Sequence, residues 1–349
     1  MEIEKITQSI KEKTKIQINR KDIERAFSAI KTTSSFWKIA DISDLVFPAL
    51  SELIKILKKE KILNIEKDKV TLTEKGRKIF KELNIPRISN LKCPYCKTYG
   101  MNFKKLKIEK KFLKIQKGKP KPLKEYDQGY VTAQTTLKRV SFALSKDDLT
   151  NKRVLILGDD DLVSIALGFL GVCKEVFVLD VDKRIIDFIQ KIKEKEKLKN
   201  INTLCWDLRK PLPFHFLSHF DTFFTDPSET LKALKLFIGR GLSSLKGEGC
   251  AGYFGLTRKE ASLRKWLRFE KILLEFGAVI TDIIYNFNEY INWGYTTSTK
   301  AFMTLPVKAL PNTLWYKSSF FRVELLKKVR WNPSFENKKL YNDFESSTV

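Results

Sequence analysis

The chain has 349 residues, of which 43% are hydrophobic, so it can build two or three domains with buried cores. No apolar run reaches the ~18 residues of a membrane span, no signal-peptide core follows the first residues, and five cysteines make no disulfide framework, so we expect a cytoplasmic protein without membrane contact. The net charge of +25 is typical either of a protein with a polyanionic partner, such as nucleic acid, or of the lysine-rich surface of a thermophile's protein.

Residues 1–88 are predicted to form a small winged-helix-like domain. Apolar residues recur at helical spacing in "DISDLVFPALSELIKILKKEKIL", and "NIEKDKVTLTEKGRKIFKEL" follows as strand, turn, strand and a helix that begins near Thr73. Such domains often bind DNA, and in enzymes they also serve as dimerisation or gating modules, so the fold alone leaves the role open.

Residues 89–125 are predicted to be a basic linker that contains a β-hairpin. Residues 104–124 hold ten lysines against one glutamate, and the alternation over 103–116 resembles a pair of strands. Cys93 and Cys96 form a CxxC pair, but no second pair follows at zinc-finger spacing, so we predict no metal site.

Residues 126–330 alternate regularly between strands and helices. Apolar strands are expected at 153–157, 175–180, 201–206, 220–226, 250–256, 278–286 and 300–305, with helices after most of them and an antiparallel strand at 318–326. This order predicts an α/β fold, a doubly wound Rossmann-type sheet of the class I methyltransferase-like kind. Residues 331–349 are polar and are predicted to form a flexible C-terminal tail.

Carboxylates follow four successive strands of the predicted sheet. They are Asp159, Asp160 and Asp161 after Gly158, Asp180, Asp207, and finally Asp226 with Glu229. Ligands of open α/β sheets bind at these strand ends, and Asp180 lies 22 residues after Gly158, close to the ~20 expected of an acid that binds ribose. Several carboxylates around one cleft repel one another and suit a polycation, with Mg²⁺ as the inorganic alternative and helix capping as the structural one.

These motifs resemble those of the branched-chain polyamine synthases. The resemblance rests on "ILGDDDLVSIAL", on "TDPSET" after the fourth strand, and on "EYDQGYVTAQTTLKRV" before the sheet, and it extends over nearly the whole chain. It implies an aminopropyltransferase whose donor is decarboxylated S-adenosylmethionine. Its acceptor would be the central secondary amine of spermidine, alkylated twice to N(4)-bis(aminopropyl)spermidine with methylthioadenosine as by-product. No further cofactor is implied.

The resemblance also implies roles for individual residues. Asp159 would lie nearest the reacting centre and accept the amine proton, with Asp226 as the matching acid of the fourth strand. Gly158, Asp180 and Asp207 would hold the donor nucleoside. The remaining candidates would bind the polyamine through carboxylates, polar groups or cation–π contacts: Asp160, Asp161, Glu229, Tyr126, Gln128, Tyr290 and Trp293, with Tyr295 as a further aromatic candidate.

Two other functions stay open on the sequence alone. A nucleic-acid amino-methyltransferase would share the fold and the basic charge, although Glu229 stands where such enzymes place a base-stacking tyrosine. A DNA-binding regulator that senses polyamine would use the N-terminal domain and the basic stretch. The N-terminal domain also makes a homodimer plausible.

Overall fold

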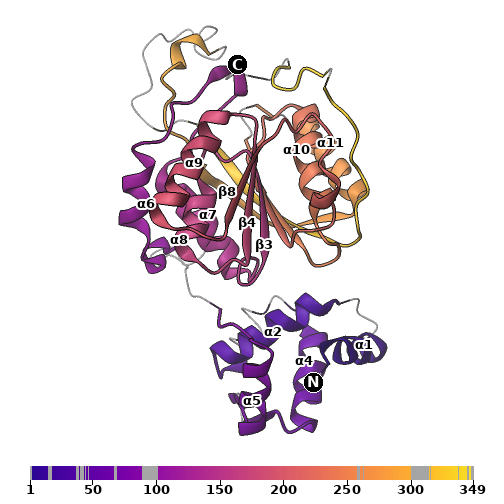
Figure 1. The fold of residues 1–349 in the computed structure, drawn as a ribbon. Coiled ribbons are helices and arrows are strands. Elements are labelled where there is room, and N and C mark those ends of the chain that lie inside the picture. The colour runs from indigo at the N-terminus through magenta and orange to yellow at the C-terminus, as the bar shows by residue number, and fades with distance from the viewer. Residues whose placement is uncertain are drawn as a thin grey trace. The chain divides into compact units, whose positions relative to one another are not determined.

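The computed structural model describes two compact units (Figure 1). One comprises residues 1–90 with 144–147, and the other comprises 91–143 with 148–349. The described residues are 2–14, 18–36, 39, 43, 45, 47–66, 69–88, 101–257, 260–261, 263–299, 314, 316–336, 338–343 and 346. Cys93, Cys96 and the predicted strand 300–305 lie outside them. In the described part of the chain, no helix is both long and apolar enough to cross a membrane.

The smaller unit is built from helices and a two-stranded hairpin. Its elements are α1 (Ile3–Thr14), α2 (Arg20–Thr32), α4 (Phe47–Lys59), β1 (Leu63–Glu66), β2 (Lys69–Leu72) and α5 (Glu74–Glu82). The helix predicted near Thr73 is confirmed, because the Thr73 hydroxyl accepts a hydrogen bond from the Gly76 N–H and caps α5. This order fits the expected winged-helix-like domain, whose likeness to that family stays a prediction.

The hairpin predicted for residues 103–116 is wrong. The segment forms a 3₁₀ turn, η1 (Phe103–Leu106), and a helix, α6 (Glu109–Gln116). Phe112 and Ile115 are buried on one side of α6, so the apolar residues of this stretch follow the helical period. Another 3₁₀ turn, η2 (Lys124–Tyr126), leads to α7 (Ala133–Ser145).

The larger unit contains a seven-stranded sheet in the order β5-β4-β3-β6-β7-β9-β8. Its strands are β3 (Arg153–Leu157), β4 (Glu175–Asp180), β5 (Ile201–Cys205), β6 (Thr222–Thr225), β7 (Ala251–Leu256), β8 (Ala278–Glu289) and β9 (Lys317–Leu325). β3 to β7 are parallel, and β9 runs antiparallel between β7 and β8. The predicted methyltransferase-like sheet is confirmed, with its order reversing beside β3, where such sheets bind ligands.

Helices cover both faces of this sheet (Figure 1). α7, α8 (Val163–Leu170) and α9 (Lys183–Glu196) lie on one face, and α10 (Leu231–Ser244) and α11 (Leu263–Phe276) on the other. The buried strands are continuous apolar runs because both of their faces are covered. Short 3₁₀ turns, η3 (Phe214–Phe216) and η4 (Thr296–Ser298), lie in the connections.

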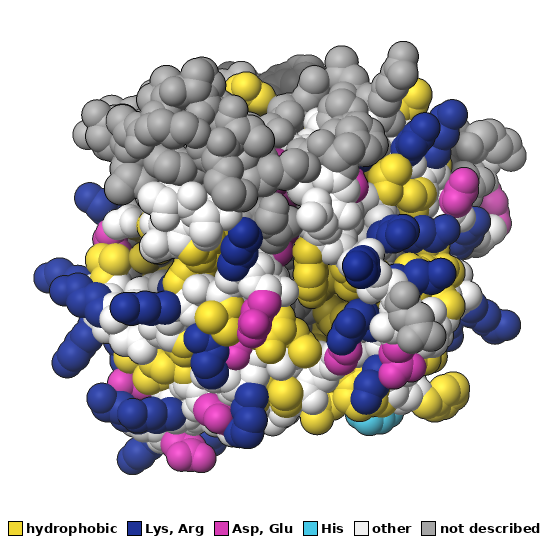
Figure 2. All heavy atoms as spheres, turned by 90° about the horizontal axis from the view of Figure 1, so that it is seen from above, with side chains coloured by type: hydrophobic (Ala, Val, Ile, Leu, Met, Phe, Trp, Pro, Cys, Tyr) yellow, Lys and Arg dark blue, Asp and Glu magenta, His cyan; other side chains and the backbone are white. Residues whose placement is uncertain are grey.

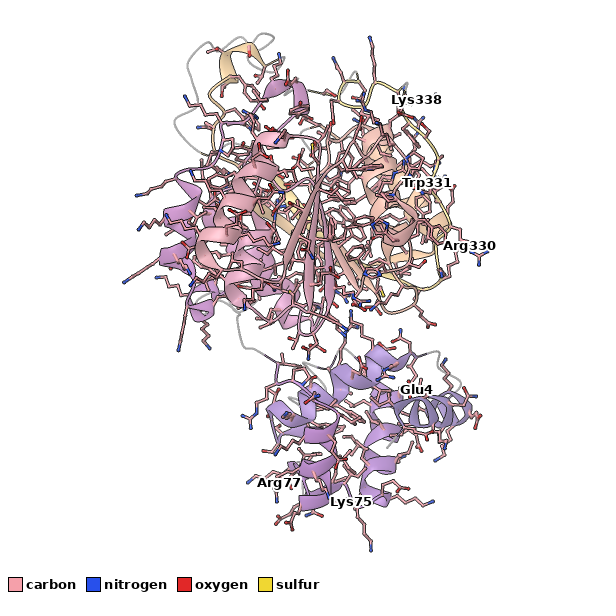
Figure 3. The ribbon with its side chains drawn as sticks, viewed as in Figure 1. Glu4, Lys75, Arg77, Arg330, Trp331 and Lys338 are labelled. Carbon is pink, nitrogen blue, oxygen red and sulfur yellow. The ribbon has the colours of Figure 1, made fainter. Side chains whose placement is uncertain are left out.

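The described residues of the C-terminal segment from Trp331 to Leu340 pack on the sheet domain, where the sequence predicts a flexible tail. The Arg240 guanidinium donates to the Asn332 side chain at 2.6 Å and to the Pro333 carbonyl at 2.6 Å. Leu340 is buried against α10, and Trp331 contacts the same helix at Gly239. Figure 3 shows Trp331 and Lys338 along this segment.

Candidate active site

A partly open cleft, whose empty space of about 1020 Å³ includes open solvent, lies at the carboxyl ends of β3 to β7. Its wall is rich in carboxylates, namely Asp127, Asp160, Asp180, Asp207, Asp226, Glu229 and Glu260. It is equally rich in aromatic side chains, namely Tyr126, Trp206, Phe237, Tyr290, Trp293, Tyr295, Tyr316 and Tyr341. The cleft is therefore acidic although the chain carries a net charge of +25, and Lys and Arg side chains are spread over an outer face (Figure 2).

The turn after β3 separates its three aspartates. Gly158 has φ +75°, which an L side chain rarely adopts, and Leu162 also has a positive φ, +57°. The chain changes direction twice within five residues, so the three carboxylates cannot share one environment. Asp160 is the member of the three that lines the cleft.

That Asp159 lies nearest the reacting centre stays a prediction, while the structure shows how its carboxylate is held. Its carboxylate accepts hydrogen bonds from the backbone N–H groups of Val163 at 2.6 Å and Ser164 at 3.1 Å, at the beginning of α8. It is 1% exposed and does not line the cleft. Burial raises the pKa of Asp159 to about 7. Asp159 therefore caps a helix and shapes the turn.

Asp161, which is predicted to bind substrate, has its partners within the protein. Its carboxylate pairs with Arg139 at 2.9 Å and accepts a hydrogen bond from the Val131 N–H at 2.8 Å, outside the cleft lining. Arg139 is buried on α7 and also binds Asp226 at 2.7 Å. The arginine thus joins the turn after β3 to the end of β6. The sequence analysis missed Arg139, which follows Lys138 in α7 and has no spacing signal of its own.

Asp160 presents an unusual carboxylate to the cleft. Among the residues that the structure describes, no group donates a hydrogen bond to that carboxylate. Burial raises its pKa well above the ordinary value, Asp161 adds to the rise, and Lys119 opposes it. A carboxylate with a raised pKa and free acceptor positions is suited to accept a proton from a cationic ligand.

Asp226, at the end of β6, lines the same cleft as Asp160. The Tyr290 hydroxyl donates to its carboxylate at 2.8 Å, in addition to the contact with Arg139. A Cβ built on Gly255 of β7 would lie 2.2 Å from the Asp226 Oδ1 atom, so the glycine makes room for this carboxylate. The structure therefore brings together the predicted site residues Asp226 and Tyr290. Their contacts leave the Asp226 carboxylate less freedom to move than a solvent-exposed carboxylate would have.

The end of the cleft at β3 to β5 contains Gly158, Asp180 and Asp207, the residues predicted to hold the donor nucleoside. The Asp180 carboxylate accepts hydrogen bonds from the N–H groups of Asp159 at 2.9 Å and Asp182 at 2.8 Å, and burial raises its pKa to about 6. Asp207 pairs with Arg209, at 2.7 Å from its Nη2 atom, and these contacts lower the Asp207 pKa.

A second acidic group lies at Glu229, which is predicted, and Glu260, which is not. The Tyr316 hydroxyl donates to the Glu260 carboxylate and lies 3.5 Å from a Glu229 oxygen. Burial raises the Glu229 pKa well above its ordinary value, with Glu260 as the next cause. The sequence carries no spacing signal for Glu260 or Tyr316, because they come from the loop after β7 and the start of β9.

The remaining predicted residues also line the cleft. Gln128 donates to the Asp182 carboxylate at 3.0 Å and accepts from the Leu123 N–H at 2.8 Å, which ties η2 to the turn after β4. Trp293 packs with Tyr316 at 5.1 Å between ring centroids and with Tyr295 at 6.1 Å. Tyr126 completes the wall. Such ring faces suit bulky cations.

Metal binding has no geometric support within the described ranges. No group of three or more His, Cys, Asp or Glu side chains among these residues could hold a metal ion. The cleft instead contains two sets of carboxylates. One consists of Asp160 and Asp226 and the other of Glu229 and Glu260, and aromatic side chains line the same cleft. This arrangement can hold an elongated ligand with several positive charges beside a nucleoside.

Comparisons of the sequence and of the structure with known proteins point to the same family. A model of the branched-chain polyamine synthase A C-terminal domain matches residues 107–348. N(4)-bis(aminopropyl)spermidine synthases of Methanocaldococcus jannaschii and Thermococcus kodakarensis are 45% and 42% identical, each over 99% of this chain and 100% and 99% of their own. The structure of the branched-chain polyamine synthase of Thermus thermophilus with N4-aminopropylspermidine and 5'-methylthioadenosine has a TM-score of 0.70 and 36% identity, over 99% of this chain and 98% of that one. The chain therefore belongs to the branched-chain polyamine synthase family.

Proposed function

We propose that this protein transfers aminopropyl groups from decarboxylated S-adenosylmethionine to the central amine of spermidine, twice. The products are N(4)-bis(aminopropyl)spermidine and two molecules of methylthioadenosine. The observation that carries the proposal is the acidic, aromatic cleft at the strand ends of a strongly basic protein. Family membership supports the same reaction.

The donor fits the end of the cleft near β4 and β5. Asp180 follows β4, where an acid can accept hydrogen bonds from ribose hydroxyls, and Gly158 allows close approach of the backbone. Decarboxylation removes the donor's carboxylate and leaves an ammonium. A lining of carboxylates attracts that ammonium and would repel the carboxylate of ordinary S-adenosylmethionine.

The chemical step is a displacement at carbon. The lone pair of the acceptor amine attacks the carbon bonded to the sulfonium, the C–S bond breaks, and its electron pair stays on sulfur as neutral methylthioadenosine. Asp160 accepts the proton that otherwise occupies the lone pair of the secondary amine. In the second transfer the tertiary amine must also give its proton to Asp160 before its lone pair can attack, and Asp226 stabilises the developing quaternary ammonium.

The other ammonium groups of the acceptor need partners as well. Glu229 and Glu260 form the second acidic group, joined through the Tyr316 hydroxyl. An ammonium there would relieve the repulsion between the two carboxylates. The aromatic faces of Trp293 and Tyr295 suit the bulky central cation.

Three wider features belong to the same proposal. The leaving group is a neutral thioether, so the displacement needs no Lewis acid, and we expect full activity in the presence of a metal chelator. We expect a homodimer, to be checked by sedimentation equilibrium, and a cytoplasmic location, to be checked by cell fractionation.

The first experiment is a pair of incubations of the full chain with spermidine. One contains decarboxylated S-adenosylmethionine, the other ordinary S-adenosylmethionine, and mass spectrometry follows the polyamine. We expect a gain of one and then two aminopropyl units with the decarboxylated donor alone. Methylation of added RNA or DNA, without polyamine transfer, would contradict the proposal.

A further inference from the structure

The basic stretch before the sheet domain contacts the aspartate turn from outside the cleft. The Lys119 ammonium donates to the Asp160 carbonyl at 2.9 Å, and the Gln116 side chain donates to the Asp161 carbonyl at 3.1 Å. Both residues come from the end of α6 and the loop that follows it. Neither lines the cleft.

Aromatic packing holds Lys119 in place. Its ammonium lies 3.6 Å from the centre of the Tyr130 ring, and the Tyr130 hydroxyl donates to the Pro120 carbonyl at 2.7 Å. Tyr130 is 2% exposed. The lysine thus lies between a ring face and the turn, where a cation–π contact favours its charged form.

The turn gathers several carboxylates, of which Asp161 pairs with Arg139. The charges of Asp159, Asp160 and Asp161 act on Lys119. Burial and then the carboxylates of Asp161, Asp180 and Asp226 raise the pKa of Asp160, and the charge of Lys119 opposes this rise. Burial lowers the pKa of Lys119, and the three aspartates oppose this.

We propose that Lys119 is a positioning residue for Asp160: it holds the backbone of the aspartate turn and supplies a positive charge that favours the ionised form of the Asp160 carboxylate. This inference rests on the proposed function, in which Asp160 takes the amine proton. It also gives one lysine of the basic stretch a role in the reaction instead of in binding nucleic acid.

The test separates charge from hydrogen bonding. Lys119→Gln keeps a hydrogen-bond donor and loses the charge, and Lys119→Arg keeps the charge. Lys117→Gln is the matched control, because Lys117 lies in the same stretch and is exposed. For each variant, kcat/KM for spermidine is measured between about pH 5 and pH 9, together with methylthioadenosine affinity by calorimetry.

We expect the acidic limb of the Lys119→Gln profile to move up by about one pH unit, with about tenfold lower kcat/KM on that limb. Lys119→Arg and Lys117→Gln should keep the limb of the unmodified protein, and methylthioadenosine affinity should stay within about twofold in all variants. An unmoved limb in Lys119→Gln, or an equal loss of nucleoside affinity, would overturn the inference. Absence of transfer by the unmodified chain would instead count against the proposed function.

Discussion

At the scale of single residues, the three neighbouring aspartates of the turn after β3 have different environments. Asp159 caps α8 and Asp161 binds Arg139, while Asp160 lines the cleft. The sequence predicts that acids gather at this strand end, but not which of them faces the ligand. That choice depends on the positive φ angles of Gly158 and Leu162, and leucine is not a residue from which a left-handed turn is expected.

Substitution of the two adjacent aspartates should give unequal losses. Asp160→Asn removes the proposed proton acceptor, so we expect kcat to fall about 10²- to 10⁴-fold with little change in stability. Asp159→Asn weakens a helix cap, so we expect the unfolding free energy to fall by about 1 kcal/mol and transfer to persist. Steady-state kinetics and thermal unfolding of both variants check this. An equal fall in kcat for the two variants would indicate that Asp159 also acts in catalysis.

Nucleoside binding should depend on pH through Asp180. Burial raises its pKa to about 6, so the group gains a proton as the pH falls through that value. The neutral acid is a weaker acceptor for ribose hydroxyls than the carboxylate. We therefore expect methylthioadenosine affinity, measured by calorimetry, to fall between about pH 7 and pH 5. Asp180→Asn should bind weakly at every pH, and a flat profile for the unmodified chain would contradict the assignment.

At the scale of elements, close packing between strands holds the reacting carboxylates. β7 passes so near the end of β6 that Gly255 has no room for a side chain beside Asp226. The same position approaches Ser318 on β9 and the Tyr290 hydroxyl after β8, so three strand ends converge there. A substitution on β7 therefore acts on Asp226 without removing any polar group.

Gly255→Ala should reduce transfer without preventing folding. The added Cβ would displace the Asp226 carboxylate, and misplacement by about 1 Å can cost up to about 10²-fold in rate. We expect kcat to fall about 10- to 100-fold while methylthioadenosine affinity is kept. Gly294→Ala is the control, because a Cβ there meets no atom within 4 Å. Unchanged kcat in Gly255→Ala would show that Asp226 can move freely.

The prediction of helices and strands succeeded where the spacing of apolar residues fitted one type of element. It failed where the spacing fitted both a strand and a helix. The buried strands β3, β4 and β6 are apolar runs followed by helices, a pattern with a single interpretation. In residues 103–116, apolar residues alternate with lysines, and Ile108, Phe112 and Ile115 also lie at helical spacing. Contacts far apart in sequence, such as Tyr316 with Glu260, follow from the folded chain and leave no local pattern.

At the scale of the whole molecule, each of the two units has a hydrophobic core of its own among the described residues. The core of the smaller unit is made of residues between Ile3 and Ile85, and that of the sheet lies in the larger unit. A unit with its own core can fold by itself. The positive charge is spread over an outer surface, while the cleft collects the carboxylates.

A fragment of residues 1–90 should fold alone. We expect helical circular dichroism and one cooperative thermal transition, because the described buried residues of its core all lie within the fragment. The same fragment tests the regulator interpretation, since a DNA-binding unit should bind duplex DNA in a salt-dependent manner. A fragment without a cooperative transition would contradict the separation of the cores.

The C-terminal segment has a practical consequence for protein engineering. Leu340 and Tyr341 form part of the cleft wall, and the segment is anchored by the Thr230 hydroxyl at the Leu340 carbonyl and by Lys265 at Asp343, 2.9 Å apart. Purification handles and fusion partners are therefore better attached at the N-terminus. Libraries that seek new acceptor amines can include these last residues among the randomised positions, although they lie far along the chain from the aspartate turn.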